Sequence, residues 1–316
     1  MKRRSFLASS LAIPSAVALA NEAGSAAQRT KGTFNLSLKA DAIGVEADAW
    51  ALLDAAKEYG YDMLSVPAQW LDGWSAADKK KFADRAAKNK IGWGANGLPI
   101  EFRKSDAQFK ADLAALPKHA ANLAEIGVTR IGTWILPMHA ELTYNENMEQ
   151  HGQRLRDAAR ILKQEGIALG LEYLGTTALR HSARFAFISS GKECKELIAA
   201  IGEPNVGVIL DSYHWYTARE TTDDLMLWSN DEIVAVDLND ANAQLSLDQQ
   251  TDVARELPGA TGVIDINGFL QTLAKIGYDG PMRAEPFSQT LNKMSNELAL
   301  RATIDAMKGV ITKAGL

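Results

Sequence analysis

The sequence predicts a single-domain α/β protein, a (β/α)8 barrel over residues 33–316. Eight short apolar segments alternate with amphipathic helical stretches from residue 34 to the end of the 316-residue chain. Several helical stretches end in glycine directly before the next apolar segment, which is the usual C-terminal stop of a helix. No linker or shift in composition divides the chain. Eight strands in this alternation fit a barrel, with a doubly wound open sheet as the alternative.

The eight strand candidates are short and rich in apolar or small residues. In chain order they are FNLSL (34–38), DMLSV (62–66), IGWGA (91–95), RIGTWI (130–135), ALGLEY (168–173), VGVILD (206–211), IVAVDL (233–238) and PMRAE (281–285). Near-continuous apolar runs of this kind are typical of parallel strands that are buried on both faces. Helices are expected between them, for example DAWALLDAAKEYG (48–60), QFKADLAALPKHAANLAEIG (108–127) and NMEQHGQRLRDAARILKQEG (147–166).

The first 32 residues are predicted to lie outside the barrel. Residues 1–20 combine a basic start with an apolar run and the small-residue ending Ala18-Leu19-Ala20, which is the three-part layout of an export signal. The pair Arg3-Arg4 resembles the bacterial twin-arginine signal. We therefore expect export by the twin-arginine machinery into the periplasm and cleavage after Ala20. Residues 21–32 are expected to form a polar, alanine-rich spacer.

Composition and charge exclude several functions. Residues 1–20 carry three basic side chains and no acidic one, so their removal changes the net charge from −5 to −8. An acidic chain without a basic run is unsuited to nucleic acid or anionic lipid. No stretch of 18 or more apolar residues indicates a membrane anchor after the leader. The single cysteine, Cys194, permits no intramolecular disulfide. The sequence leaves open whether the protein forms a homo-oligomer.

Four successive strand candidates end in an acid. Glu172 ends the fifth, Asp211 the sixth, Asp237 the seventh and Glu285 the eighth. The chemistry of a (β/α)8 barrel takes place at the C-terminal ends of its strands, so these side chains should converge on one side of the mouth. A single acid at a strand end is usually a helix cap or part of a loop salt bridge. Four carboxylates together repel one another unless they are protonated or neutralised, and a divalent cation such as Mg²⁺ or Mn²⁺ would neutralise them with oxygen ligands alone.

The same segments resemble the xylose isomerase-like TIM barrels, a superfamily of sugar isomerases and epimerases. The resemblance covers most of the chain after residue 33 and is strongest in GLEY, NVGVILDSYHW, VDLND, RELPGATGVIDINGFLQTLAKIGYDGP and AEPF. It implies that one divalent metal, Mn²⁺ or Mg²⁺, is held by Glu172, Asp211, Asp237 and Glu285. Related ketose 3-epimerases carry histidine at the Asp237 position, so this aspartate is a departure that should raise the charge of the ligand set. Asn239 or Asp240 is the alternative ligand from the seventh strand.

Four further residues are candidates for binding the substrate. His214, three residues after Asp211, matches a substrate-contacting histidine of the epimerases, and Arg255 matches an arginine that holds a substrate oxygen. His181 follows the fifth strand and could reach the substrate, and Trp134 lies near a strand end, where its ring could stack on a sugar. The simpler alternatives are a structural histidine, an exposed loop arginine, a surface position for His181 and core packing for Trp134.

The resemblance implies a metal-dependent isomerase or epimerase. Glu172 and Glu285 would be the two acid–base residues: one removes a proton beside a carbonyl and the other returns it, through a cis-enediolate. Because sugar phosphates are cytoplasmic, an exported protein should act on a free sugar, keto-sugar or cyclitol. The alternatives are a dehydratase of the inosose type on the same site and a non-catalytic periplasmic sugar-binding protein. The zinc endonucleases of the superfamily use many histidines, which a chain with five does not match.

Overall fold

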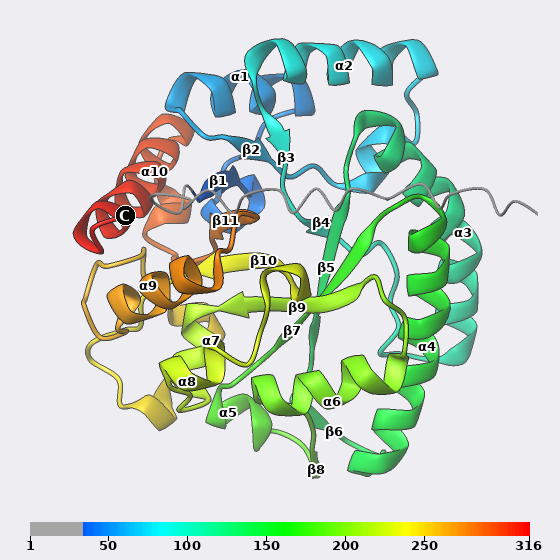
Figure 1. Ribbon diagram of the computed structural model, residues 1–316, viewed down its shortest axis with the longest axis vertical. Coiled ribbons are helices and arrows are strands. Elements are labelled where there is room, and N and C mark those ends of the chain that lie inside the picture. Colours follow the sequence, from blue (N-terminus) through cyan, green and yellow to red (C-terminus); the bar gives the residue numbers. More distant parts are fainter. Residues whose placement is uncertain (1–33) are drawn as a thin grey trace, which may run out of the picture. The chain divides into compact units, whose positions relative to one another are not determined.

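A ring of parallel strands forms the centre of the computed structural model, which describes residues 34–316 (Figure 1). The main sheet has the strand order β3-β2-β1-β11-β10-β9-β7-β5-β4. Its strands are β1 (Asn35–Leu38), β2 (Met63–Leu64), β3 (Gly92–Trp93), β4 (Asn96–Gly97), β5 (Arg130–Ile135), β7 (Ala168–Tyr173), β9 (Val206–Asp211), β10 (Ile233–Leu238) and β11 (Pro281–Ala284). The predicted leader and spacer, residues 1–32, lie outside the described residues.

The barrel closes through one interrupted strand. β3 and β4 are the two ends of the sheet order, yet they follow each other directly along the chain. β3 pairs with β2, and β4 pairs with β5. Backbone hydrogen bonds from Gly94 to the carbonyl of Leu64 (3.0 Å) and from Leu98 to the carbonyl of Gly132 (2.9 Å) extend both ladders. β3 and β4 together therefore form the third of eight strands, and the predicted (β/α)8 barrel is confirmed.

Helices surround the barrel between successive strands (Figure 1). The long ones are α1 (Ala49–Tyr59), α2 (Ala76–Asn89), α3 (Asp106–Ile126), α4 (Tyr144–Gln164), α6 (Gly191–Ile201), α9 (Ile266–Ile276) and α10 (Asn296–Lys313). The short ones are α5 (Thr177–Arg180), α7 (Ser212–Thr217) and α8 (Thr222–Leu225), and the 3-10 turns are η1 (Ala40–Ile43), η2 (Ala68–Leu71), η3 (Asn230–Glu232), η4 (Leu247–Gln249), η5 (Asp252–Ala254) and η6 (Leu291–Lys293). No helix within residues 34–316 combines the length and apolar character that crossing a membrane requires.

The elements agree closely with those expected from the sequence. β5, β7, β9 and β10 have the predicted bounds, and the other strands differ from them by a few residues at their ends. An antiparallel ribbon of β6 (Met138–His139) and β8 (Phe185–Ala186) was not expected. Each of its strands has two residues, which is too short to produce a periodic pattern.

The lumen of the barrel contains few apolar side chains, unlike the layer between the sheet and the helices. Lumens of such barrels are usually filled by layers of large branched side chains. Here a separate small apolar cluster consists of Ala95, Ile209 and Ala235. At Gly94 a Cβ atom would lie 2.1 Å from Ser37 Oγ, so that position has no space for a side chain. Small residues in the lumen leave room for the charged side chains described below.

Candidate active site

The four predicted acids meet at the C-terminal ends of neighbouring strands. Glu172 lies on β7, Asp211 ends β9, Asp237 lies on β10 and Glu285 directly follows β11. One carboxylate oxygen of each lies within 4.8 Å of those of the other three, and all four side chains are buried. Asp237 is the register partner of Asp211 across the β9–β10 ladder. We call these four residues the acidic cluster.

Two basic side chains reach the acidic cluster from outside its own strands. Lys39 directly follows β1 and donates a hydrogen bond to Glu285 Oε1 (2.6 Å). Arg255 directly follows η5, and its Nη1 donates to Asp211 Oδ2 (2.9 Å). Both cations line the same cavity as the glutamates. The sequence singled out Arg255 through its resemblance to relatives, whereas it gave no reason to select Lys39.

Asp237, the departure from the family pattern, has a cation of its own. Arg283 on β11 donates from Nε to Asp237 Oδ1 (2.5 Å) and from Nη2 to Oδ2 (2.9 Å). Its Nη1 donates to the carbonyl of Ala95 (2.9 Å), in the chain segment between β3 and β4. The guanidinium of Arg283 therefore offsets the negative charge that Asp237 adds to the ligand set.

Asp211 and the two alternative seventh-strand ligands have different surroundings. Asn239 donates from Nδ2 to both oxygens of Asp211 (2.9 and 3.1 Å), and its Oδ1 accepts from the backbone N–H of Glu285 (3.0 Å). Burial raises the pKa of Asp211 to about 7, although Arg255 acts in the opposite direction. Asp240 instead accepts backbone N–H groups of the 261–264 loop. Asn239 thus holds the cluster together, and Asp240 holds the loop.

Glu172 is the acid of the cluster that lacks a close cation. Its Oε1 is buried and has no hydrogen-bond partner within residues 34–316. The Nε2 of His214 lies 3.8 Å from that oxygen. Burial raises the pKa of Glu172 well above its ordinary value of 4.5, and the charges of Glu285, Asp211 and Asp237 add to this rise. The surroundings of Glu172 therefore favour its protonated form.

Glu285 has the opposite environment. Burial acts to raise the pKa of its carboxyl group as well. The charges of Lys39, Arg283 and Arg255 outweigh burial and lower the pKa of Glu285 to about 2. The surroundings of the two glutamates thus shift their pKa values in opposite directions, and the difference comes from which of them faces the cations.

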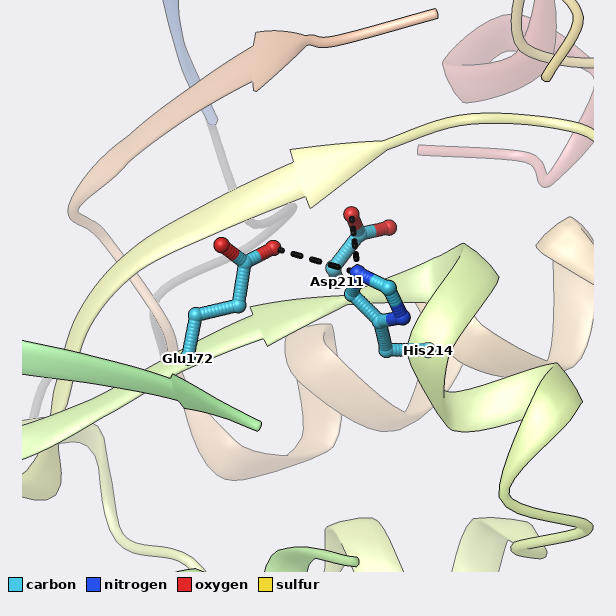
Figure 2. Close-up of side chains that lie close together, drawn as sticks. All are labelled: Glu172, Asp211 and His214. Carbon is cyan, nitrogen blue, oxygen red and sulfur yellow. Dashed lines mark ion pairs between the residues drawn. The ribbon is translucent and has the colours of Figure 1, made fainter. Parts of the chain in front are cut away.

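His214 lies beside Glu172 and Asp211, and its ring faces both carboxylates (Figure 2). It belongs to α7 and is fully buried, with its Nε2 4.0 Å from Asp211 Oδ2. Its Nδ1 accepts from the backbone N–H of Gly175 (3.2 Å), and its Nε2 faces Arg255 Nη2 at 2.9 Å. Burial, followed by the charge of Arg255, lowers the pKa of His214 well below 6.5. His214 is not among the side chains of residues 34–316 that line the cavity, so it contacts the site through the acids and Arg255.

A cavity of about 240 Å³ opens beside the acidic cluster. This volume lies below the roughly 300–1,000 Å³ of sites for drug-sized ligands, so it suits a single small molecule such as a monosaccharide. The lining side chains are Lys39, Asn96, Thr133, Trp134, Glu172, Leu174, Ile209, Asp252, Arg255, Arg283, Glu285 and Phe287. Phe287 has a φ of 44°, a conformation that is strained for a bulky residue, and its ring lies 5.1 Å from the guanidinium of Arg255.

The two remaining candidates lie in different places. Trp134 is the register partner of Glu172 across the β5–β7 ladder, and its side chain lines the cavity. It is 48% exposed, and the guanidinium of Arg103 lies 4.2 Å from the centre of its ring. His181 directly follows α5, is exposed and borders a separate hollow beside Arg219. The structure therefore places Trp134 at the cavity and does not bring His181 to it.

The donor set of the acidic cluster fits a divalent cation. Hard divalent ions prefer carboxylate oxygens, and four such oxygens lie within reach of one point. Oε1 of Glu172 supplies the clearest sign, because a buried carboxylate oxygen without a partner is costly. Any ion there would share Asp211, Asp237 and Glu285 with the basic residues that already contact them.

Residues 53–310 match the family model described as a xylose isomerase-like TIM barrel. Among solved structures, a xylose isomerase domain protein from Alicyclobacillus acidocaldarius has a TM-score of 0.79 at 31% identity, covering 90% of this chain and 100% of that one. The IolI protein with a bound zinc atom has a TM-score of 0.75 at 19% identity, covering 89% and 99%. D-psicose 3-epimerase from Clostridium cellulolyticum, solved with D-tagatose, has a TM-score of 0.65 at 16% identity, covering 84% and 94%.

A curated relative, the inosose isomerase of Bacillus velezensis, is 18% identical over 266 residues, which are 83% of this chain and 91% of the relative. Likenesses at such low identity show the fold. The family model covers most of the chain, and the Alicyclobacillus protein is 31% identical over nearly all of it. The chain therefore belongs to the family of xylose isomerase-like TIM barrels, as its sequence motifs indicated.

Proposed function

We propose that the protein is a divalent-metal-dependent isomerase or epimerase that acts on a free sugar, keto-sugar or cyclitol. The observation that carries this proposal is the pair of glutamates at one cavity with opposite surroundings: Glu172 Oε1 has no hydrogen-bond partner within residues 34–316, whereas Glu285 Oε1 accepts from Lys39. Two titratable groups whose environments push their pKa values apart are typical of an acid–base pair. The names of the relatives, inosose isomerase and D-psicose 3-epimerase, support the same class of reaction.

In the proposed reaction each glutamate has one task. Glu285 is ionised and accepts the proton from the carbon beside the substrate carbonyl. Glu172 holds a proton and returns it. Return to the opposite face of the same carbon gives epimerisation, and return to the neighbouring carbon gives isomerisation. A divalent ion held by Glu172, Asp211 and Glu285, with Asp237 as the nearest further carboxylate, would lower the cost of negative charge on the substrate oxygens. We propose Mn²⁺ or Mg²⁺ for the all-oxygen donor set.

The charge of the site supports an uncharged substrate. Three cations face five carboxylates around the cavity, namely Lys39, Arg255 and Arg283 against Glu172, Asp211, Asp237, Asp252 and Glu285. A divalent ion would make this set neutral with all five carboxylates ionised, and would leave one excess positive charge with the proton on Glu172, which is less than the charge of a phosphate dianion. Export by the twin-arginine route into the periplasm, which we propose from the leader, agrees with a free sugar or cyclitol.

The proposal is tested by metal reconstitution and turnover. Chelator-treated protein is supplied with Mn²⁺, Mg²⁺, Zn²⁺ or no metal and is incubated in D₂O with ketoses, keto-sugars and inososes. We expect one ion per chain, product formation that depends on it, and deuterium at the reacting carbon. Loss of water from the substrate would identify the dehydratase alternative instead. Sugar binding without turnover under every metal condition would identify the binding protein.

A further inference from the structure

The β1 to β4 side of the cavity carries two hydrogen-bond donors that the proposed chemistry does not use. Most site residues expected from the sequence belong to the other side of the barrel. They lie on β7, β9 or β10, or in the segments that follow β7, β9 and β11. Lys39 instead follows β1, and Asn96 begins β4. Both line the cavity. This part of the site was not apparent from the sequence, because neither residue stands in a pattern that distinguishes it.

Lys39 has donor capacity left for a ligand. An ammonium group carries three N–H donors. One is directed to Glu285 Oε1 at 2.6 Å, and Asp41 Oδ2 lies at the longer distance of 3.5 Å. The Lys39 side chain is 19% exposed, so it is not closed off from the cavity. Arg283 differs, because its Nε, Nη1 and Nη2 all donate to protein oxygens.

Asn96 has a donor without an acceptor. Its Oδ1 accepts the backbone N–H of Val66 at 2.7 Å, which fixes which end of the amide is the oxygen. Its Nδ2 is buried and has no hydrogen-bond partner within the described part of the chain. The residue as a whole is 2% exposed. Buried polar groups almost always have a partner, so an unpaired amide nitrogen in a cavity wall indicates a ligand oxygen as the missing acceptor.

We propose that Lys39 and Asn96 form a donor wall that binds hydroxyl or carbonyl oxygens of the substrate. The identity of the substrate as a sugar or cyclitol rests on the proposed function, which this inference deepens. The acids and a bound ion would act on the reacting carbons, and the donor wall would donate hydrogen bonds to the oxygens on the other carbons. The site then selects polyhydroxylated substrates and rejects analogues that lack the oxygen facing Asn96 or Lys39.

The two donors should give different kinetic results. Asn96 has no hydrogen bond to the acidic cluster within residues 34–316, so Asn96→Ala should leave the acids in place. Because alanine also removes the acceptor of the Val66 N–H, the thermal stability of Asn96→Ala is measured beside its kinetics. The variant should affect substrate binding and not the chemical step. It should raise KM about 5- to 100-fold with kcat changed by less than about twofold. Lys39 also holds Glu285, so Lys39→Met should lower kcat as well as raise KM. An exposed asparagine on α4 provides the matched control, and Asn145→Ala should change neither constant.

Monodeoxy analogues identify the oxygen that each donor binds. Calorimetry on chelator-treated protein measures their binding without relying on turnover. We expect wild type to bind one analogue about 5- to 100-fold more weakly than the parent compound, and Asn96→Ala to bind the two equally. If Asn96→Ala discriminates against every analogue as strongly as wild type does, Asn96 is not part of a donor wall.

Chemical rescue separates substrate contact from a structural role for Lys39. Cys194 is buried, so the thiol of Lys39→Cys is the accessible one within residues 34–316 and reacts selectively with bromoethylamine, which restores an ammonium. Substrate binding should recover at least about tenfold on alkylation. Recovery of thermal stability without recovery of binding would overturn the role of Lys39.

These measurements also separate the inference from the proposed function. Turnover together with unchanged discrimination in both variants overturns the donor wall alone. Binding with the expected discrimination but without turnover overturns the enzyme proposal and retains the donor wall. Absence of binding for every sugar and cyclitol tested overturns both.

Discussion

Replacing Glu172 or Glu285 by glutamine should change the stability of the metal-free protein in opposite directions. Glutamine keeps the shape of the side chain and removes its charge. The two glutamates belong to one cluster and are similarly buried, so burial alone predicts the same effect for both. Their partners differ, because Glu172 Oε1 has none within residues 34–316 and Glu285 accepts from Lys39.

The magnitude for Glu172 follows from its raised pKa. At pH 7 the unfolded chain carries this group ionised, and folding must bury the charge or take up a proton. The pKa of Glu172 lies well above 4.5 in the folded protein, so the cost grows by about 1.4 kcal/mol for each pH unit above 4.5. It reaches at most about 3 kcal/mol at pH 7. Glu172→Gln removes this cost, and the gain should vanish below pH 4.5, where both states are protonated.

For Glu285 the sign is reversed. A pKa of about 2 in place of 4.5 corresponds to about 3 kcal/mol of stability. This contribution is fully present above pH 4.5 and is lost as the pH falls towards 2. Glu285→Gln loses it and also leaves the ammonium of Lys39 without its closest partner.

Urea unfolding in the presence of a chelator tests both values. The unfolding free energies of wild type, Glu172→Gln and Glu285→Gln are compared at pH 7 and at pH 4. At pH 7 we expect Glu172→Gln above wild type and Glu285→Gln below it. Both variants should lose about 10² to 10⁴-fold in metal-supported turnover. A shift of both variants in the same direction at pH 7 would refute the argument that the cations move the pKa values of the two glutamates apart.

Three further predictions concern other parts of the chain. Asp237→Asn leaves the buried guanidinium of Arg283 without its carboxylate and should lower the unfolding free energy by about 3–5 kcal/mol. The double variant Asp237→Asn/Arg283→Met should recover much of this loss. Burial lowers the pKa of His151 to about 3. The unfolded chain therefore binds a proton that the folded protein does not, and the unfolding free energy should fall by up to about 5 kcal/mol between pH 6.5 and pH 3. His151→Leu should flatten the measured dependence of the unfolding free energy on pH in that window. Lysine in place of Arg3 and Arg4 should leave the protein in the cytoplasmic fraction of the cell, and unchanged export would show that another route carries it.

The strands and the acids could be predicted from the sequence for one physical reason. A strand buried on both faces needs an apolar run, and an acid directly after such a run has no role in packing, as at Asp211 and Glu172. The cations of the site could not be found in this way. Lys39 follows a strand as many exposed lysines do, and its partner Glu285 lies 246 residues away. Contacts between residues so far apart in the sequence form only when the barrel closes, and the spacing of apolar residues within one segment does not predict them.

Arg283 is the exception, because a signal for it was present. Side chains of a strand alternate between its two faces, so Arg283 and Glu285, two residues apart, both point into the lumen. A basic residue at position 283, beside a buried ring of acidic residues, could have been predicted to neutralise one of their charges. The same reasoning links Arg283 to the departure at Asp237. Aspartate in place of a neutral imidazole adds a fully buried negative charge, which is costly unless a cation pairs with it. Family members with aspartate at the seventh-strand position should therefore carry a base two residues before the eighth-strand glutamate, and those with histidine there should not need one.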